Sequence, residues 1–179
     1  HFEVQTLGDQ HGNAIHLFER DCSSQRRHQK LVEEAPAPGV DPKKRDQVCR
    51  SAAELIRNAK YSGAATVEFL MDKHQNFYML EVNTRVQVEH PVTEMITGVD
   101  IVAETIKVTA GQKLSVKQDE IKVNGHAIEV RVNAEDPNRN FMPQAGLIET
   151  FVAPGGPGVR WDSHVRPGYR IPSNYDSMI

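Results

Sequence analysis

The stretch Phe77-Tyr-Met-Leu-Glu-Val-Asn-Thr-Arg-Val-Gln-Val-Glu-His90 decides the fold at the centre of this chain, because polar and aliphatic residues alternate along it from Glu81 onward. Successive side chains of a strand point to opposite faces, so the pattern predicts a strand with one face in the core. The polar face would carry Glu81, Asn83, Arg85, Gln87 and Glu89, and the aliphatic face Leu80, Val82, Val86 and Val88. A solvated outer face is the plain alternative, but this run of acids, amides and a guanidinium contains no lysine, which favours a site.

The polar face is too long for one small substrate. At about 3.3 Å per residue, a straight strand would separate Glu89 from Glu81 by roughly 26 Å. We therefore predict either a bend after Thr84 or two neighbouring subsites along the face.

A hairpin is predicted around the turn-like residues 72–76, because runs of aromatic and aliphatic residues precede and follow them. One pairing register sets Glu68 directly opposite Glu81, and two carboxylates about 5 Å apart repel unless a cation lies between them. With Asn83 on the same face, the natural cation is Mg²⁺ or Mn²⁺, which prefers oxygen ligands. In the alternative register Glu68 points to the other face and no such site forms.

The composition indicates a soluble protein with an ordinary core. The chain has 179 residues, a net charge of −3 and 39% hydrophobic residues, with no apolar run of membrane-spanning length and no signal-peptide layout. Cys22 and Cys49 form no paired motif, so we expect a reducing, cytoplasmic setting.

A basic cluster raises the question of nucleic acid binding. It contains Arg26, Arg27, His28 and Lys30. The acidic net charge argues against nucleic acid. The cluster is then either a solvated edge or a group of side chains that face nucleotide phosphates.

The rest of the chain mixes strands and helices, so the predicted fold class is α+β. Residues 2–7 and 14–19 read as a strand pair, Asp41-Pro42 starts a helix that stops near Gly63, and Asp100 caps a second helix to about Ala110. A short turn or helix opens at Pro91. The polar residues 113–124 are the expected boundary between domains 1–120 and 121–179, with a strand at 126–133 in the second domain.

Four blocks of the sequence together resemble the biotin carboxylase family of ATP-grasp ligases. They are ERDCSSQRRHQK (19–30), EEAPAP (33–38), EVNTRVQVEHPVTEMITG (81–98) and NAEDP (133–137), in the order in which that family carries them. The resemblance implies the C-terminal half of an ATP-grasp domain, an antiparallel sheet with helices, followed by a partial, mostly β biotin carboxylase C-terminal domain.

The resemblance also implies an activity. Members of the family use MgATP to activate bicarbonate through carboxyphosphate, and they carboxylate biotin held on a biotin carboxyl carrier protein or domain. They work with a carboxyltransferase subunit, in acetyl-CoA carboxylase of fatty acid biosynthesis or in related carboxylases, and commonly form homodimers. Neither nucleic acid nor membrane is an expected partner.

The family's site residues carry over to matching positions of this sequence. The metal ligands would be Glu68, Glu81 and Asn83, and the nucleotide would meet His1, Gln25, His28 and Leu70. Bicarbonate would be held by Arg85, Gln87 and the backbone N–H of Val88. Lys30 would lie near the reacting phosphate, Glu89 would be the general base kept ionised by Arg85, and Arg131 would stabilise the enolate-like charge on biotin.

Two alternatives remain open on the sequence. One is another bicarbonate-activating ATP-grasp ligase, similar to carbamoyl-phosphate synthetase, against which residues 85–90 and Arg131 argue. The other is a non-catalytic structural or assembly fragment that retains the family's surface. For Arg131 by itself, the alternative to a catalytic role is a salt bridge with Glu129 on an edge strand.

The matched blocks begin partway through the family's nucleotide site, so we expect this chain to be a piece of a longer protein. We predict that the isolated chain binds ATP weakly and turns nothing over. A biotin-dependent ATPase assay on the isolated chain checks this, and normal turnover would contradict it.

Overall fold

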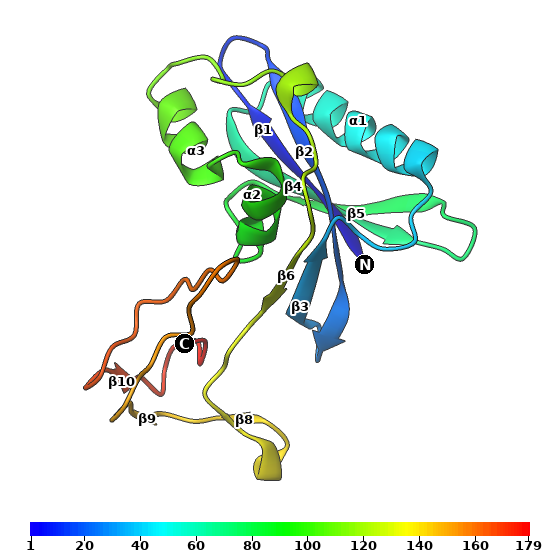
Figure 1. The fold of residues 1–179 in the computed structure, drawn as a ribbon. Coiled ribbons are helices and arrows are strands. Elements are labelled where there is room, and N and C mark those ends of the chain that lie inside the picture. The colour runs from blue at the N-terminus through cyan, green and yellow to red at the C-terminus, as the bar shows by residue number, and fades with distance from the viewer. The chain divides into compact units, whose positions relative to one another are not determined.

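A six-stranded antiparallel sheet forms the centre of the first part of the chain in the computed structural model, which describes residues 1–179 (Figure 1). Its spatial order is β5-β4-β1-β2-β3-β6. The strands are β1 (Phe2–Gly8), β2 (Ala14–Arg26), β3 (Gln29–Ala35), β4 (Gly63–Met71), β5 (Phe77–Asn83) and β6 (Ala127–Val130). Short turns join β1 to β2, β2 to β3 and β4 to β5, so most neighbours in the sheet are also neighbours in sequence.

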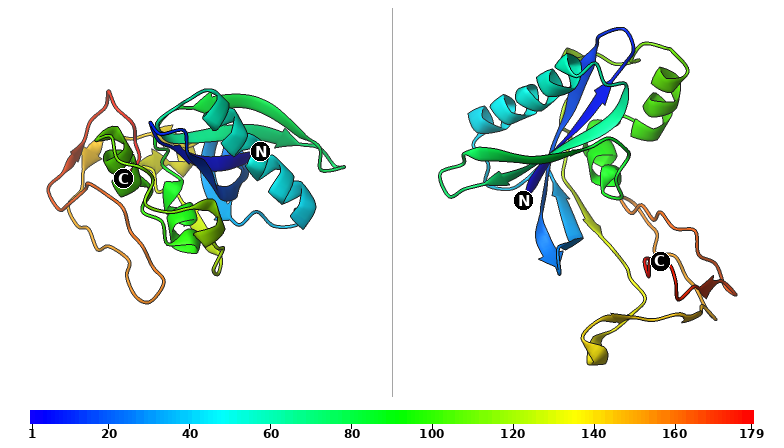
Figure 2. Two further views of the ribbon diagram at one scale, coloured as in Figure 1. Left: turned by 90° about the horizontal axis from the view of Figure 1, so that it is seen from above. Right: turned by 180° about the vertical axis from the view of Figure 1, so that it is seen from behind.

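Three helices pack against this sheet: α1 (Pro42–Asn58), α2 (His90–Thr97) and α3 (Ile101–Thr109). The Asp41 side chain caps α1 by accepting from the backbone N–H groups of Lys43 and Lys44, and Asp100 caps α3 at Ala103. These helix starts confirm the sequence prediction. Figure 2 shows α1, in cyan, lying apart from α2 and α3, in green.

The two faces of the sheet differ in chemistry. On one face, alternate residues of β1 and β4 form an apolar cluster with α1, made of Val4, Ala65, Val67 and Phe69 against Val48, Cys49, Ala52 and Ile56. On the other face, Leu7 and Ala64 pack against Ile101 of α3. Strand alternation places Glu3, Gln5, Thr66 and Glu68 on this second face. The polar site is therefore built on the side of the sheet opposite α1.

The central hairpin adopts one of the two registers that the sequence left open, the one that sets Glu68 opposite Glu81. Glu68 pairs with Glu81 and Thr66 pairs with Asn83, with a register shift between Glu68 and Phe69. Strand β5 ends at Asn83, and the backbone turns before α2 begins at His90. The predicted bend at Thr84 is confirmed.

The predicted aliphatic face of this stretch is only half right. Val82 and Val86 pack against the two core clusters, whereas Leu80 is 48% and Val88 39% exposed. Because β5 is an edge strand and the chain leaves the sheet after Asn83, a two-residue period cannot describe the whole stretch.

The chain divides into two compact units, His1–Val130 and Arg131–Ile179. The compact units divide after Val130, whereas the prediction divided the domains after residue 120. The strand β6 pairs with β3 from Ala35↔Ala127 to Val32↔Val130, so its residues belong to the first sheet. A 3-10 turn, η1 (Gln118–Glu120), lies in the polar segment that we expected to separate the domains.

The second unit is mostly β, as predicted, with little helix. It contains the strand pairs β7 (Glu135–Asp136) with β8 (Met142–Pro143) and β9 (Gly146–Leu147) with β10 (Arg170–Ile171), and the 3-10 turn η2 (Pro137–Arg139). The predicted α+β class is confirmed. None of the helices combines the length and apolar content needed to cross a membrane.

Gly8 offers a test of the packing between β1 and the end of α1. A Cβ at Gly8 would lie 2.2 Å from the backbone oxygen of Tyr61, in the segment between α1 and β4, and a backbone atom cannot easily move away. We expect Gly8→Ala to lower the free energy of unfolding by about 1–3 kcal/mol, as overpacking does. Urea unfolding followed by circular dichroism measures this.

The matched control is Gly146→Ala, since Gly146 is also a strand glycine but its Cβ would meet no atom within 4 Å. Equal stability of the Gly8 variant and the wild type would contradict the packing described for Gly8.

Candidate active site

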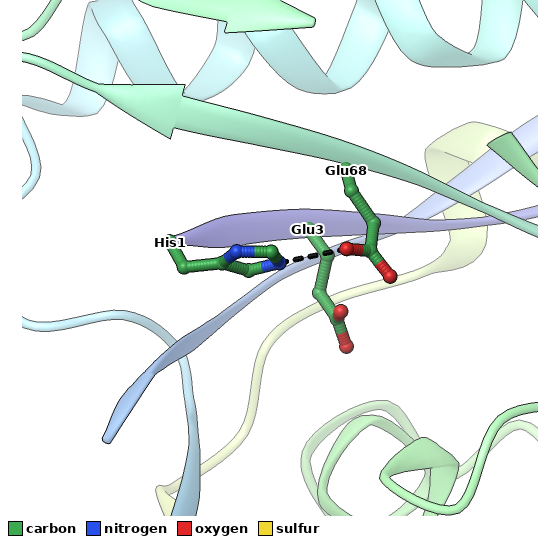
Figure 3. Close-up of side chains that lie close together, drawn as sticks. All are labelled: His1, Glu3 and Glu68. Atoms are coloured by element: carbon green, nitrogen blue, oxygen red, sulfur yellow. Dashed lines mark hydrogen bonds and ion pairs between the residues drawn. The ribbon is translucent and has the colours of Figure 1, made fainter. Parts of the chain in front are cut away.

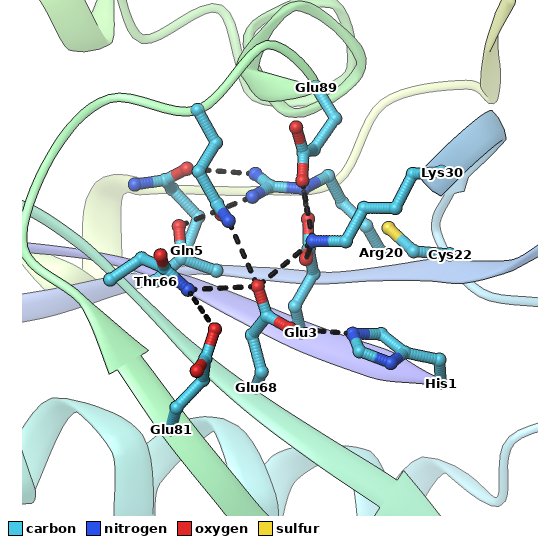
Figure 4. Close-up of polar contacts among 12 residues, drawn as sticks. His1, Glu3, Gln5, Arg20, Cys22, Lys30, Thr66, Glu68, Glu81 and Glu89 are labelled. Atoms are coloured by element: carbon cyan, nitrogen blue, oxygen red, sulfur yellow. Dashed lines mark hydrogen bonds and ion pairs between the residues drawn. The ribbon is translucent and has the colours of Figure 1, made fainter. Parts of the chain in front are cut away.

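Charged side chains from five separate parts of the first unit converge on the second face of the sheet (Figure 4). Glu3 comes from β1, Arg20 from β2, Lys30 from β3 and Glu68 from β4, while Glu89 directly precedes α2. All but Lys30 are buried, with Glu89 2% and Arg20 0% exposed. Buried charges are retained only where they are paired, so this cluster must be held together by its own contacts.

The Lys30 ammonium lies at the centre of the cluster. Its Nζ donates to Oε1 of Glu68 at 2.9 Å, to Oε1 of Glu89 at 2.7 Å and also to Oε2 of Glu3. Burial alone would lower the pKa of Lys30, but Glu3 and Glu89 raise it well above its ordinary value. Lys30 is therefore a fixed positive charge among three carboxylates.

Glu89 is ionised because of Lys30 and Arg20. Burial alone would raise the pKa of Glu89, but the charges of Arg20 and Lys30 outweigh it and lower the pKa to about 2. Our expectation that Arg85 keeps Glu89 ionised is wrong. Arg85 is exposed, and its guanidinium instead donates to Oδ1 of Asn83 at 3.3 Å.

Glu68 accepts hydrogen bonds from several directions. His1 Nε2 lies 2.8 Å from its Oε2, and its Oε1 accepts from Gln87 Nε2 at 2.9 Å and from Asn83 Nδ2 at 2.9 Å. Burial raises the pKa of Glu68, but the hydrogen bonds from His1, Lys30 and Gln87 lower it to about 2. Figure 3 shows His1 and Glu3 beside this carboxylate.

The three predicted metal ligands lie together. Asn83 Nδ2 bridges the facing carboxylates, donating to Glu68 Oε1 at 2.9 Å and to Glu81 Oε1 at 3.1 Å. The amide group thus lessens the repulsion between the Glu68 and Glu81 carboxylates, which a bound cation would also lessen. The two carboxylates are oxygen ligands of the kind that Mg²⁺ or Mn²⁺ takes, and the Asn83 amide would join them by turning its oxygen, which now accepts from Arg85, towards the ion. The residue types therefore fit such an ion. A second group of potential ligands, His1, Glu3 and Glu68, has its ligand atoms within 4.8 Å of one another.

The residues predicted to hold bicarbonate lie in the turn between β5 and α2. Gln87 is 5% exposed, and its Oε1 is buried with no hydrogen-bond partner, while its Nε2 is bound to Glu68. Val88 is exposed in the same turn. A buried acceptor without a partner costs free energy, so Gln87 Oε1 is suited to a donor from a ligand.

The other predicted nucleotide contacts lie around the cluster and not within it. Gln25, near the end of β2, donates from Nε2 to the carbonyl of Cys22 at 2.9 Å, and His28 is exposed in the turn between β2 and β3. Leu70 follows Glu68 in β4 and is exposed. Arg131 is the first residue of the second unit, and its role remains a prediction.

The sequence prediction missed Glu3 and Arg20. In β1, Glu3 alternates with apolar neighbours as on any solvated strand face, and in β2 Arg20 stands between two acidic residues, Glu19 and Asp21, as an exposed arginine often does. Only the packing of α2 and the turn before it buries Glu3 and Arg20. The one available signal was that Arg20 lies within the block 19–30 that also carries Lys30.

Comparison with known proteins agrees with this geometry. Residues 1–117 match the family model described as carbamoyl-phosphate synthase L chain, ATP binding domain, and residues 129–179 match the biotin carboxylase C-terminal domain. The first match defines the class, proteins with an ATP-binding domain of this type. The second narrows it: the chain belongs to the biotin carboxylase family of ATP-grasp ligases.

Individual relatives are similar over the whole chain. Biotin carboxylase of Pseudomonas aeruginosa is 55% identical over 179 residues, which are 100% of this chain and 39% of the relative. The alpha subunit of mitochondrial methylcrotonoyl-CoA carboxylase of Rattus norvegicus is 53% identical over 180 residues, covering 100% of this chain and 25% of the relative. The chain thus spans well under half the length of these relatives.

A solved structure has nearly the same fold. The biotin carboxylase domain dimer of the Hydrogenobacter thermophilus 2-oxoglutarate carboxylase, in complex with MgADP, ADP and bicarbonate, superposes with a TM-score of 0.96 at 49% identity. The match covers 99% of this chain and 39% of that chain. The predicted family and ATP-grasp fold are confirmed.

The lowered pKa of Glu89 predicts a pH dependence of stability. Because the pKa is about 2 in the folded protein against an ordinary 4.5, ionised Glu89 stabilises the fold above pH 4.5. This contribution, of the order of 3 kcal/mol, is lost as the pH falls from 4.5 towards 2. We expect Glu89→Gln to lose less stability than the wild type over that range, as measured by urea unfolding at a series of pH values.

The control is Glu54→Gln, an exposed position on α1, which should keep the wild-type pH dependence. The same pH dependence in the Glu89 variant and the wild type would contradict the ionic role of Glu89.

Proposed function

We propose that the protein carrying this chain is an ATP-dependent biotin carboxylase, which activates bicarbonate and transfers its carboxyl group to biotin on a carrier protein. The observation that carries the proposal is the buried cluster around Lys30, directly beside the facing carboxylates Glu68 and Glu81. It combines a base, a fixed cation and a metal-type ligand set within one site. The likeness to a domain solved with MgADP and bicarbonate adds support.

Glu89 is the proposed general base that removes the proton of bicarbonate. With a pKa of about 2 it is ionised at neutral pH, but so weak a base accepts a proton poorly. Lys30 is one of the two cations that lower this pKa. If an anionic substrate draws Lys30 towards itself, burial raises the pKa of Glu89 and makes it a stronger base at the moment it is needed.

Arg85, Gln87 and the backbone N–H of Val88 are the proposed bicarbonate-binding groups. Arg85 is exposed and its hydrogen bonds are long, 3.3 Å to Asn83 and 3.4 Å to the carbonyl of Val86, so its guanidinium can turn to clamp an anion. The unpartnered Gln87 Oε1 can accept from the O–H of bicarbonate. The proposed anion-binding groups, Arg85, Gln87 and Val88, and the proposed base, Glu89, then lie in the same turn of the backbone.

Glu68, Glu81 and Asn83 are the residues that would hold Mg²⁺ or Mn²⁺. Such an ion supplies positive charge next to the nucleotide phosphates. Lys30 adds a second positive charge on the same side of the sheet. His1, Gln25, His28 and Leu70 are proposed to contact the nucleotide, and Arg131 to stabilise the enolate-like charge on biotin.

The proposed partners are a biotin carboxyl carrier protein or domain, a carboxyltransferase and a second copy of the protein. Support comes from relatives: one solved homologue is a complete multifunctional pyruvate carboxylase from Rhizobium etli, of which the matched part is 18%, and another is a biotin carboxylase domain dimer. Cys22 and Cys49 are both buried free thiols, which is consistent with the reducing cytoplasm as the proposed location.

The activity is tested by biotin-dependent ATP hydrolysis and by incorporation of labelled bicarbonate into biotin, using the native protein. Glu89→Gln should lower turnover by about 10²–10⁴-fold, the usual contribution of a general base, while Glu54→Gln should leave it unchanged. ATP cleavage that needs bicarbonate and ignores biotin would instead indicate a ligase like carbamoyl-phosphate synthetase. No ATP cleavage at all would indicate a structural role.

The metal site is tested separately from activity. We expect Glu81→Gln to weaken Mn²⁺ binding by about tenfold or more, because it removes one of two carboxylate ligands. Electron paramagnetic resonance of free Mn²⁺ measures the affinity. Since Glu81 is exposed, the variant should fold normally. The control Glu54→Gln should keep the wild-type affinity for Mn²⁺. If Glu81→Gln also keeps that affinity, the ion binds elsewhere.

A further inference from the structure

We propose that Arg20 is a positioning residue for this site: it fixes Glu3 beneath Lys30 and holds the start of α2, from which Glu89 reaches the same lysine. The inference rests on the proposed function and extends it to a residue that lies behind the reacting groups. Arg20 is the largest of the fully buried side chains and is 0% exposed. A substrate arriving from solvent cannot touch it, so any influence on the reaction passes through its neighbours.

The guanidinium of Arg20 is held by four side chains. Its Nε donates to Glu3 Oε1 at 2.7 Å, and its Nη1 donates to Gln5 Oε1 at 2.8 Å and to Thr93 Oγ1 at 2.9 Å. Its Nη2 donates to Thr66 Oγ1 at 3.4 Å. Because the guanidinium is a rigid planar fork, these contacts set the distances between β1, β2, β4 and α2.

Two of these contacts lead directly to the reacting groups. The second oxygen of Glu3 accepts from Lys30 Nζ, so the Glu3 carboxylate is clamped between Arg20 and Lys30 (Figure 4). Thr93 lies in α2, and Glu89 is the residue that caps the start of that helix. A shift of Thr93 would therefore move Glu89 relative to Lys30.

A role in stability alone does not explain this arrangement. Burying an ion pair in a core is often no more stabilising than apolar packing, and the neighbouring core positions of the sheet are apolar. The first unit also contains another buried carboxylate with an arginine partner, Glu19 with Arg45 at 2.6 Å. That pair joins β2 to α1 and to the backbone at Ala37, away from Lys30.

The Arg45 pair supplies a matched control for the experiment. In the native protein, Arg20→Lys keeps the charge but loses the fork geometry, and it should lower kcat of biotin-dependent ATP cleavage by about 10–100-fold with the KM for ATP within about threefold. Arg45→Lys should leave kcat unchanged. Thr93→Val, which removes one hydroxyl, should lower kcat by a smaller factor, and the double variant should be no slower than Arg20→Lys alone.

Hydrogen exchange supplies a readout that does not depend on activity. Backbone amides of residues 87–97 should exchange faster in Arg20→Lys and in Thr93→Val than in the wild type, and at the wild-type rate in Arg45→Lys. If the proposed activity is absent, this comparison still tests the positioning of α2. If Arg20→Lys fails to fold, kcat and hydrogen exchange are both measured on Thr93→Val.

Three outcomes would overturn the proposal. The first is a folded Arg20→Lys variant with the kcat of the wild type. The second is an Arg45→Lys variant that loses as much kcat as Arg20→Lys when both have lost the same amount of Tm. The third is hydrogen exchange of residues 87–97 at the wild-type rate in both Arg20→Lys and Thr93→Val.

Discussion

The rest of the site depends on one ammonium group shared by three buried carboxylates. Lys30 binds Glu3, Glu68 and Glu89, which come from three different parts of the first unit. Like charges so close together cannot all remain ionised without a compensating cation. Lys30 helps to lower the pKa of Glu68 and of Glu89, and its three contacts tie β1, β3, β4 and the turn before α2 into one arrangement.

The same contacts that hold the fold provide the chemistry of the site. An ionised carboxylate next to an ammonium becomes a stronger base if an anion draws that ammonium away, and two facing carboxylates can hold a divalent ion. Lys30 and Asn83 both contact Glu68, so the cation cluster and the metal-type ligand set share one carboxylate. Binding of an ion or an anion at either part must therefore alter the hydrogen bonds of the other.

The sheet separates stability from chemistry by its two faces. Residues of β1 and β4 that face α1 are apolar and form a core, and the alternate residues of the same strands carry the polar groups of the site. Because alternate side chains of a strand are held by one backbone, the apolar packing on one face fixes the positions of the charged groups on the other. On the charged face itself, the hydrogen bonds of Arg20 to Glu3 and Thr93 add to this fixation.

The sequence by itself determined the α+β class, the helix starts at Asp41 and Asp100, the central hairpin, and, through its matching blocks, the family. The helix starts and the hairpin follow from capping, from turns and from a two-residue period, which are local in sequence. The structure decided between the two open registers of the hairpin and set Glu68 opposite Glu81. Only the tertiary structure decided that Glu3 and Arg20 belong to the site, that Lys30 and not Arg85 is the partner of Glu89, and that β6 joins the first sheet. Burial and ion pairing depend on which distant segments cover a side chain, and the alternation within a single strand carries no record of that cover.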